Sequence, residues 1–466
     1  MTQSTGSSGR DTTGTTATGT GTGTAGPARP AARAVAGTGE NLRFLATHTL
    51  PTFARGFINP RPRMVRASAA LRQPEWSAAT LRSLRDRHGG APVLLRGLSG
   101  PLLVLLDEPE LRQFYSASVR DLAMDAPDKN AGLTVLEPSG VICSHGELRE
   151  DRRRINHASL AAGDTVHPCA KEFLAVVAEE ARSLTARAVL DAPEIQRSLS
   201  RMCRRIVLGD AAADDDRLTA WLSALRSEAN WLGRRRKQAR AARVLYARAD
   251  ARIAEYAAVA PAHTLGARAL TRSDPDGVLD RIGQTHHWML ALDGLAPVVA
   301  RTLLLLAAHP AEQDAVLGEA AADGRDMPRL RACVQESLRL FPLVPDLVRV
   351  TRAQTTWRGV PHPAGTAVLV PALFHGRDRD HVPAADLFAP GRWLAPEAAA
   401  DLRLAPFGHG AAACPGANLG MLLSTAVCAE VLRRHRLAGA RPTLPAAGPL
   451  PRIVDTPGIR LRLEPR

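Results

Sequence analysis

The sequence predicts a mainly α-helical chain with a smaller β region, an α+β fold class. Ala, Leu and Arg dominate the composition, which favours helix. Apolar residues recur at helical spacing through most of the middle of the chain. The last third changes character, because residues 342–415 are rich in Pro, Gly and short β-like runs. This segment is therefore expected to form loops and strands that carry the functional side chains.

The individual elements follow in chain order. Residues 1–39 are mostly Thr, Gly, Ser and Ala, and they bury too little apolar surface to offset the entropy lost on ordering. They therefore predict a disordered tail, and we expect the ordered body to begin near Leu42. Short apolar runs flanked by Gly and Pro predict strands at Pro92–Leu95, Leu102–Leu106 and Thr366–Val370. Helical spacing predicts helices at Cys169–Leu190, Ala192–Leu208, Arg217–Leu232, Arg234–Val259, Trp288–Ala308 and Gly416–His435.

Charge and cysteine usage narrow the class of protein. The formal net charge is +14, which is compatible with nucleic acid, an acidic membrane or an acidic protein partner. The chain shows no nucleic-acid-binding module, so we expect no nucleic-acid partner. Its six cysteines form no CxxC pair, which favours reduced thiols in the cytoplasm. No basic segment followed by an apolar run stands at the N-terminus, so no secretion signal is expected.

The stretch Trp288–Ala308 approaches the length of a membrane span. It contains Asp293, Pro297 and Arg301, and charges at such depths are costly in lipid. We therefore expect a buried central helix and no membrane association.

The most informative stretch surrounds Cys414, between Phe407 and Gly416. Cys414 precedes a predicted helix that begins at Pro415, and the partial positive charge of a helix N-terminus stabilises a thiolate. Glycines let the backbone approach a flat ligand closely. They stand at Gly408, Gly410 and Gly416. A lone thiolate in such a loop suits haem iron, whereas zinc would need further Cys or His ligands nearby.

This stretch resembles the haem-binding loop of the cytochrome P450 family, Phe-x-x-Gly-x-Arg-x-Cys-x-Gly. Phe407, Gly410, Cys414 and Gly416 fall in register, whereas the usual Arg or His is Ala412. The resemblance extends from about Leu42 to the C-terminus. It implies a single-domain cytochrome P450 fold over residues 40–466, with haem b (iron protoporphyrin IX) ligated by Cys414.

Two further segments match the family. Glu336 and Arg339 form its Glu-x-x-Arg helix motif, and a spacing of three places both on one helical face. Pro390-Gly391-Arg392-Trp393 resembles its Pro-x-Arg-Phe/Trp segment. By resemblance, Glu336, Arg339 and Arg392 form a buried ion network that fixes the cysteine loop, a structural role.

The haem propionates imply basic partners. By resemblance, Arg349 holds one of them, and a helix that begins near His145 supplies the partner of the other. The candidates on that helix are His145, Arg149, Arg152 and Arg153. The sequence leaves open which of these four reaches the haem.

The long helix over the haem departs from the family pattern, Ala/Gly-Gly-x-Asp/Glu-Thr. With Gly294 on the family glycine, the acid position is Ala296 and the hydroxyl position is Pro297, and neither side chain carries a proton. Proline also leaves the carbonyl one turn back unbonded, which predicts a kink. Asp293 is a candidate substitute for the catalytic acid, although one residue before Gly294 it points about 100° away from the ideal direction.

The resemblance implies an oxidoreductase, a monooxygenase acting on a small, mainly apolar organic substrate. Electrons would come from a separate ferredoxin-type donor and its reductase, and a monomer is expected. The family's acid and hydroxyl relay protons to iron-bound dioxygen, and this proton relay is missing here. Two other haem chemistries are therefore open, the use of peroxide and oxidative coupling. A catalytically altered partner protein is a further alternative, against which the retained Cys414 argues.

Overall fold

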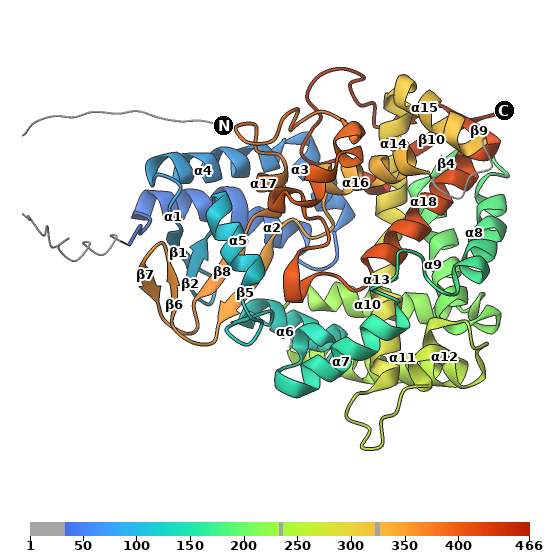
Figure 1. Cartoon of the computed structure of the whole chain (residues 1–466), viewed down its shortest axis with the longest axis horizontal. Helices are drawn as coiled ribbons and strands as arrows, with labels where there is room; N and C mark the ends of the chain where they lie inside the picture. The colour runs from blue at the N-terminus through green and yellow to red at the C-terminus, as the bar shows by residue number, and fades with distance from the viewer. Residues whose placement is uncertain (1–32, 233–235, 322–326) are drawn as a thin grey trace, which may run out of the picture.

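The computed structural model describes residues 33–232, 236–321 and 327–466 (Figure 1). Of the predicted tail, residues 1–39, positions 1–32 lie outside the described residues. From there on the chain contacts the fold, since Val35 pairs with Leu94 and the first helix begins at Thr38. The first residues of the helix predicted at Arg234–Val259 also lie outside the described residues.

The described residues form a large helical part and a smaller β-rich part, which lie at the right and left of Figure 1. The main helices are α1 (Thr38–Phe44), α2 (Leu50–Arg55), α3 (Pro62–Ala70), α4 (Gln73–Arg87), α5 (Glu108–Ser116), α6 (Pro127–Leu136), α7 (Gly146–Ser159), α8 (Ala170–Leu184), α9 (Ala192–Leu208), α10 (Asp216–Ala229), α11 (Arg236–Val259), α12 (Leu265–Leu270), α13 (Arg281–Leu292), α14 (Leu295–Ala308), α15 (Pro310–Ala321), α16 (Pro328–Leu340), α17 (Ala372–Gly376) and α18 (Ala417–Arg434). This confirms the predicted α+β class.

Ten described strands form three sheets. They are β1 (Val93–Gly97), β2 (Gly100–Val104), β3 (Leu122–Ala123), β4 (Val189–Asp191), β5 (Leu347–Thr351), β6 (Thr355–Trp357), β7 (Val360–His362), β8 (Ala367–Val370), β9 (His435–Arg441) and β10 (Arg460–Pro465). The largest sheet has the order β1-β2-β8-β5-β3, and only its β2–β8 pairing is parallel. The smaller sheets are β4-β10-β9 and β6-β7. The strands expected near residues 92–95, 102–106 and 366–370 are confirmed.

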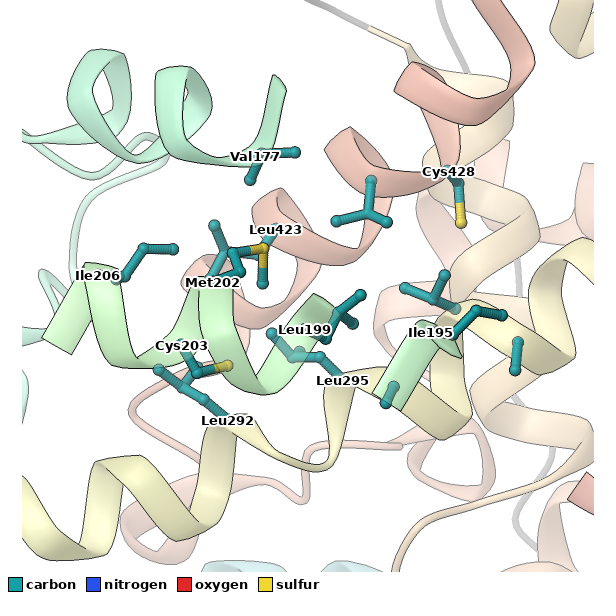
Figure 2. Packing of buried hydrophobic residues seen from close by; sticks show 14 of the residues in the cluster. Val177, Ile195, Leu199, Met202, Cys203, Ile206, Leu292, Leu295, Leu423 and Cys428 are labelled. Carbon is teal, nitrogen blue, oxygen red and sulfur yellow. The ribbon is translucent and has the colours of Figure 1, made fainter. Parts of the chain in front are cut away.

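Helix α9 shows how local sequence sets an element and its packing. Asp191 caps it by accepting the amide of Glu194, and Gly209, at φ 88°, ends it in a conformation that favours glycine. Its apolar face packs against α8 and α14, and the cluster that it joins also contains Leu423 of α18 (Figure 2). Here Leu199 lies among Leu295 and Leu423, which places α9 in the centre of the main core. Its predicted bounds are confirmed.

Three predicted helices have different bounds. The helix expected at Arg217–Leu232 is α10, which ends at Ala229. The helix expected at Cys169–Leu190 ends at Leu184, because residues 189–191 pair with β10 instead. Helix α18 begins at Ala417, with Gly416 as its N-cap, so the expectation that Pro415 is its first residue is wrong. Residue Pro415 belongs to the turn that leads into the helix.

The predicted central helix is broken, as its proline indicates. Helix α13 ends at Leu292, Asp293 and Gly294 form a turn, and α14 begins at Leu295. In a continuous helix the carbonyl of Asp293 would need the amide proton that Pro297 lacks. The restart places Pro297 in the first turn of α14, where amide groups need no partner within the helix. The predicted kink is confirmed.

Residues Arg281–Ala308 together are long and apolar enough to cross a membrane by length and composition, the one such helix among the described residues. Of the most apolar window, 72% is buried inside the protein. The predicted buried central helix is therefore confirmed.

Replacing Pro297 by Ala should restore the missing donor to the carbonyl of Asp293. We expect the amides of residues 295, 296 and 298 to exchange roughly fivefold more slowly, because a net hydrogen bond contributes about 1 kcal/mol. Hydrogen–deuterium exchange measures this. The matched control is Pro328→Ala at the first position of α16, which should leave exchange unchanged; equal rates in Pro297→Ala and the parent protein would contradict the account.

Candidate functional site

The cysteine loop is held by its own backbone. The amide of Cys414 donates to the carbonyl of Phe407 at 2.8 Å, which closes the loop. Gly408 and Gly410 have φ of 69° and 65°, values that favour glycine. A Cβ on Gly410 would lie 2.3 Å from the carbonyl oxygen of Tyr115, so only glycine fits there. The predicted glycines are thus required by the backbone, at least at these two positions.

Two residues of the motif anchor the loop to helices. The ring of Phe407 packs on an apolar cluster that joins α14, α16 and α18. A Cβ on Gly416 would lie 3.9 Å from the sulfur of Cys414 and 3.9 Å from Leu160, so Gly416 stands in van der Waals range of both. The loop therefore meets the helices on one side and presents its cysteine on the other.

Cys414 is exposed, whereas the other five cysteines are buried or half-buried; all six lie among the described residues and none forms a disulfide. The protein on the inner side of the sulfur desolvates it and raises its pKa, while the amide of Gly416 and the charge of Arg153 act in the opposite direction. No three His, Cys, Asp or Glu side chains gather into a metal-binding group in the described parts of the chain. The thiol is thus presented as a single ligand.

Three arginines surround this loop. Arg153 on α7 donates to the carbonyl of Ala413 at 2.6 Å. Arg149, one turn earlier, reaches the sulfur of Met124 at 3.7 Å. Arg349 on β5 donates to the carbonyl of Phe114 at 2.6 Å and lies over its ring, 4.1 Å from the centroid. One helix and one strand therefore carry these guanidinium groups, and Arg153 is the one that contacts the loop and acts on Cys414.

These guanidinium groups have no carboxylate partner within the described chain. Burial lowers the pKa of Arg349 to about 10, and it lowers those of Arg149 and Arg153 as well. Arg149 also repels its two neighbours, since its charge lowers both of their pKa values. Desolvated cations without an anion are costly, so the cluster favours an anionic ligand. The two propionates of a haem ligated by Cys414 fit this requirement.

The other two basic candidates have partners elsewhere. His145 Nε2 lies 3.1 Å from Asp125 Oδ2, and its side chain is largely exposed. Arg152 donates to Ser144 Oγ at 2.8 Å and to the carbonyl of Val278 at 3.1 Å. The structure therefore brings Arg149 and Arg153 to the loop and directs His145 and Arg152 away from it.

The Glu-x-x-Arg pair is the centre of a fully buried network. Arg339 Nε and Nη2 donate to Glu336 Oε2 and Oε1 at 2.8 and 2.7 Å. Arg339 also donates to the carbonyls of Gly376, Ala385 and Leu387. Both side chains are at most 1% exposed. One guanidinium thus joins α16 to three points of the segment that leads into the cysteine loop.

Glu336 receives three further donors. They are Arg392 Nε at 3.3 Å, Trp393 Nε1 at 2.8 Å and the amide of Ala389 at 3.0 Å. Burial would raise the pKa of Glu336, but the hydrogen bonds and charges of Arg339 and Arg392 hold it below its usual range. The sequence indicated the Glu–Arg–Arg set but missed the bond from Trp393, whose position in the Pro-x-Arg-Trp segment was the available signal.

Asp293 lies in the turn between α13 and α14 and is directed towards α9 and α10. Its Oδ1 accepts from Gln196 Nε2 at 2.6 Å and from Ser200 Oγ at 3.0 Å. Its Oδ2 pairs with Arg226 of α10. Ala296, at the family's acid position, is buried. These contacts tie Asp293 to structural partners, and a role in catalysis stays a prediction.

Comparison with known proteins agrees with this architecture. Residues 291–446 match the family model for cytochrome P450. The chain is similar to "Cytochrome P450 714C3" of Oryza sativa subsp. japonica, 35% identical over 179 residues, which is 35% of this chain and 33% of that protein. It is also similar to the "Cyclooctat-9-en-7-ol 5-monooxygenase" of Streptomyces melanosporofaciens, 34% identical over 154 residues, or 30% of this chain and 34% of the relative.

Two solved structures share the fold. A retinoic-acid-bound cyanobacterial CYP120A1 superposes with a TM-score of 0.67 at 18% identity, over 82% of this chain and 93% of the other. The cytochrome P450 CYP102L1 gives 0.67 at 20% identity, over 84% and 94%. The family model, the Oryza relative and both structures are thus of cytochromes P450, and the chain shares their fold and, over residues 291–446, their sequence pattern. The matched segments span about a third of the length of the two relatives, and family membership implies a haem cofactor.

Replacing Glu336 by Gln should leave Arg339 and Arg392 buried without a counter-charge. We expect the free energy of unfolding to fall by about 3–5 kcal/mol, as for other broken buried ion pairs. Urea denaturation measures the change. Glu397→Gln, on an exposed glutamate further along the same segment, is the control and should stay within about 0.5 kcal/mol of the parent protein. Similar midpoints and slopes in both variants would show that the network carries no such role.

Proposed function

We propose that this protein is a haem-thiolate monooxygenase that oxidises a small, mainly apolar organic molecule. The observation that carries the proposal is the exposed Cys414 thiol next to Arg153, which belongs with Arg149 and Arg349 to a set of guanidinium groups that form no ion pair with a carboxylate among the described residues. A single thiolate ligand and a positively charged rim match the iron and the propionates of haem b. The name of the Streptomyces relative, a monooxygenase, supports the same reaction class.

Each residue of the site has a proposed part in holding the cofactor. Cys414 ligates the iron, and Gly408, Gly410, Pro415 and Gly416 shape the loop around the sulfur, with Phe407 beneath it. Arg149, Arg153 and Arg349 neutralise the propionates. The amide of Gly416 tunes the thiolate. When bound, the haem supplies the activation of an oxidant and its transfer to carbon.

Water, the substrate or Asp293 must supply the protons that dioxygen activation needs, because Ala296 and Pro297 have none to give. The same observation favours a second candidate function, in which the enzyme uses peroxide or couples substrate radicals oxidatively. Turnover with hydrogen peroxide in the absence of any electron donor separates the two: a rate comparable to that with reductant and dioxygen favours the peroxide reaction.

The partners follow from the same proposal. Electrons come from a separate ferredoxin-type donor and its reductase, and the chain's net charge of +14 suits an acidic donor. We further propose a monomeric, cytoplasmic enzyme that binds neither nucleic acid nor membrane.

Replacing Cys414 by Ala should remove the thiolate ligand. The reduced protein with carbon monoxide should then lose the Soret band of thiolate-ligated haem. Cys428→Ala, on a fully buried cysteine of α18, is the control and should keep that band. A thiolate band that survives in Cys414→Ala would refute the ligand assignment.

Replacing Arg153 by Gln should weaken haem binding. A charge-assisted hydrogen bond contributes about 1.5–3 kcal/mol, so the affinity should fall by roughly tenfold or more. Transfer of haem to an apo-globin measures the loss. Arg152→Gln, on the neighbouring residue of α7, removes the same charge from a side chain bound to Ser144 and Val278 and should leave haem retention unchanged. Equal losses in both variants would indicate an effect of overall charge.

A further inference from the structure

A small cavity lies between α4 and the segments that flank β5 and β8, and none of its lining residues belongs to the cysteine loop. Its volume is about 30 Å³. A cavity needs about 10–15 Å³ to hold one water molecule, so this one has room for roughly two waters or for one ion somewhat larger than water. The proposed parts of Cys414 and of the arginines near it make no use of this cavity.

Most of the cavity wall is apolar. Pro74, Ala78 and Leu81 of α4 are three or four positions apart and therefore share the face that closes one side. Leu373 and Phe374 of α17 form another part of the wall. Apolar surroundings screen charges poorly, so a charged group on this wall acts strongly on whatever the cavity holds.

Arg452 is a charged group of the wall with little compensation. Its side chain is 5% exposed, and its Nη2 lies 3.5 Å from Asp386 Oδ1. The same Nη2 donates to the carbonyl of Arg377 at 2.8 Å. Asp386 is also paired with Arg377 at 2.8 Å and with the exposed Arg379. One carboxylate thus serves three guanidinium groups, two of which are buried.

One donor of Arg452 is left without a partner. Its Nη1 is buried and makes no hydrogen bond within the described residues. The cavity is lined by Arg452 but not by Arg377 or Asp386, the residues bound to Nη2. The guanidinium therefore turns its Nη1 side towards the cavity. The more distant charges that act on Arg452 are two carboxylates and two guanidinium groups, those of Asp386, Glu75, Arg82 and Arg379.

A second guanidinium group lines the same cavity. Arg55 of α2 donates to Gln73 Oε1 and to Thr52 Oγ1, and both of these acceptors are neutral. Burial lowers the pKa of Arg55, and the charge of Asp346 acts in the opposite direction. Arg55 forms no ion pair with a carboxylate in the part of the chain that the structure describes.

Asp346 is the only carboxylate among the lining residues, all of which the structure describes. Its Oδ2 lies 3.5 Å from His48 Nε2, and His48 Nδ1 is hydrogen-bonded to Ser77 Oγ at 2.7 Å. Two guanidinium groups against one carboxylate leave the wall with an excess positive charge, and a proton on His48 would add to it. Neutral water does not offset this charge, whereas an anion does.

We propose that this cavity binds a small inorganic monoanion of the size of chloride. The anion accepts a hydrogen bond from Arg452 Nη1, and Arg55 contributes the second positive charge. Phosphate, or a carboxylate that carries an organic body, is too large for a cavity of about 30 Å³. A bound ion links α2 to the segment around residue 452 and so stabilises the N-terminal helices on the rest of the fold. The site does not depend on the proposed function of Cys414.

Diffraction from crystals of the haem-loaded protein grown in sodium bromide tests the proposal, because bromide replaces chloride and scatters anomalously. We expect an anomalous peak in this cavity in the parent protein and its loss in Arg452→Gln. Arg379→Gln is the matched control and should keep the peak, because it removes an exposed guanidinium group from the same carboxylate without altering the cavity wall. A cavity that holds only water in the parent protein, or a peak that persists in Arg452→Gln, overturns the proposal.

A second variant keeps the test decisive should Arg452→Gln fail to fold. Ala78→Val retains every charge and narrows the cavity. Melting midpoints are measured in sodium chloride and in sodium gluconate of equal ionic strength, since gluconate is too large to enter. The gain in chloride over gluconate should be roughly 1–2 °C larger in the parent protein and in Arg379→Gln than in Ala78→Val. Equal gains in the parent protein and Ala78→Val overturn the anion site.

Discussion

The buried pair of Glu336 and Arg339 is the interaction on which the arrangement of the site depends. Two opposite charges removed from water are tolerated only where every donor and acceptor has a partner. The N–H groups of Arg339 that do not bond to Glu336 donate to carbonyls between residues 376 and 387. Glu336 in turn accepts hydrogen bonds from the segment at 389–393. That segment leads directly into the cysteine loop. The segment between residues 376 and 393 is poor in helix and strand. The bonds of this one ion pair thus hold it in place next to the loop that carries the thiolate ligand.

The features that could be predicted from sequence are those with a local cause. Helix α9 has its cap, its terminating glycine and its apolar face within twenty residues, and Pro297 breaks the central helix through its own missing donor. Features set by distant partners could not be predicted. The end of α8 depends on pairing with β10, which is far away in the sequence, and the bond between Trp393 and Glu336 spans 57 positions. The order of residue types along the chain does not indicate directly which distant residues come into contact.

Helix α7 shows how geometry separates residues that look alike in sequence. Arg149 and Arg153 are four positions apart in regular helix and therefore share the face that meets the cysteine loop. Arg152 lies on another face and is bound to Ser144. His145 is also four positions from Arg149, but it is the N-cap and has extended backbone angles, so helical spacing does not apply to it. The four basic candidates divide accordingly into two that are bound to residues away from the loop and two on the face of α7 from which Arg153 reaches Ala413.

The break at Asp293 and Gly294 divides the central helix into two halves that pack against different sets of helices. Helix α14 packs against α16 and α18, the helices that hold the ion pair and follow Cys414, whereas α13 packs against α11 and α12. Asp293 would be unfavourable at the C-terminal end of α13, because its charge opposes the helix dipole, but Arg226 of α10 neutralises it. The broken helix is therefore stabilised by contacts on both sides of the turn. Ala296 and Pro297, which replace the family's acid and hydroxyl, thus lie in the first turn of α14, the half that packs against the helices of the ion pair and of Cys414.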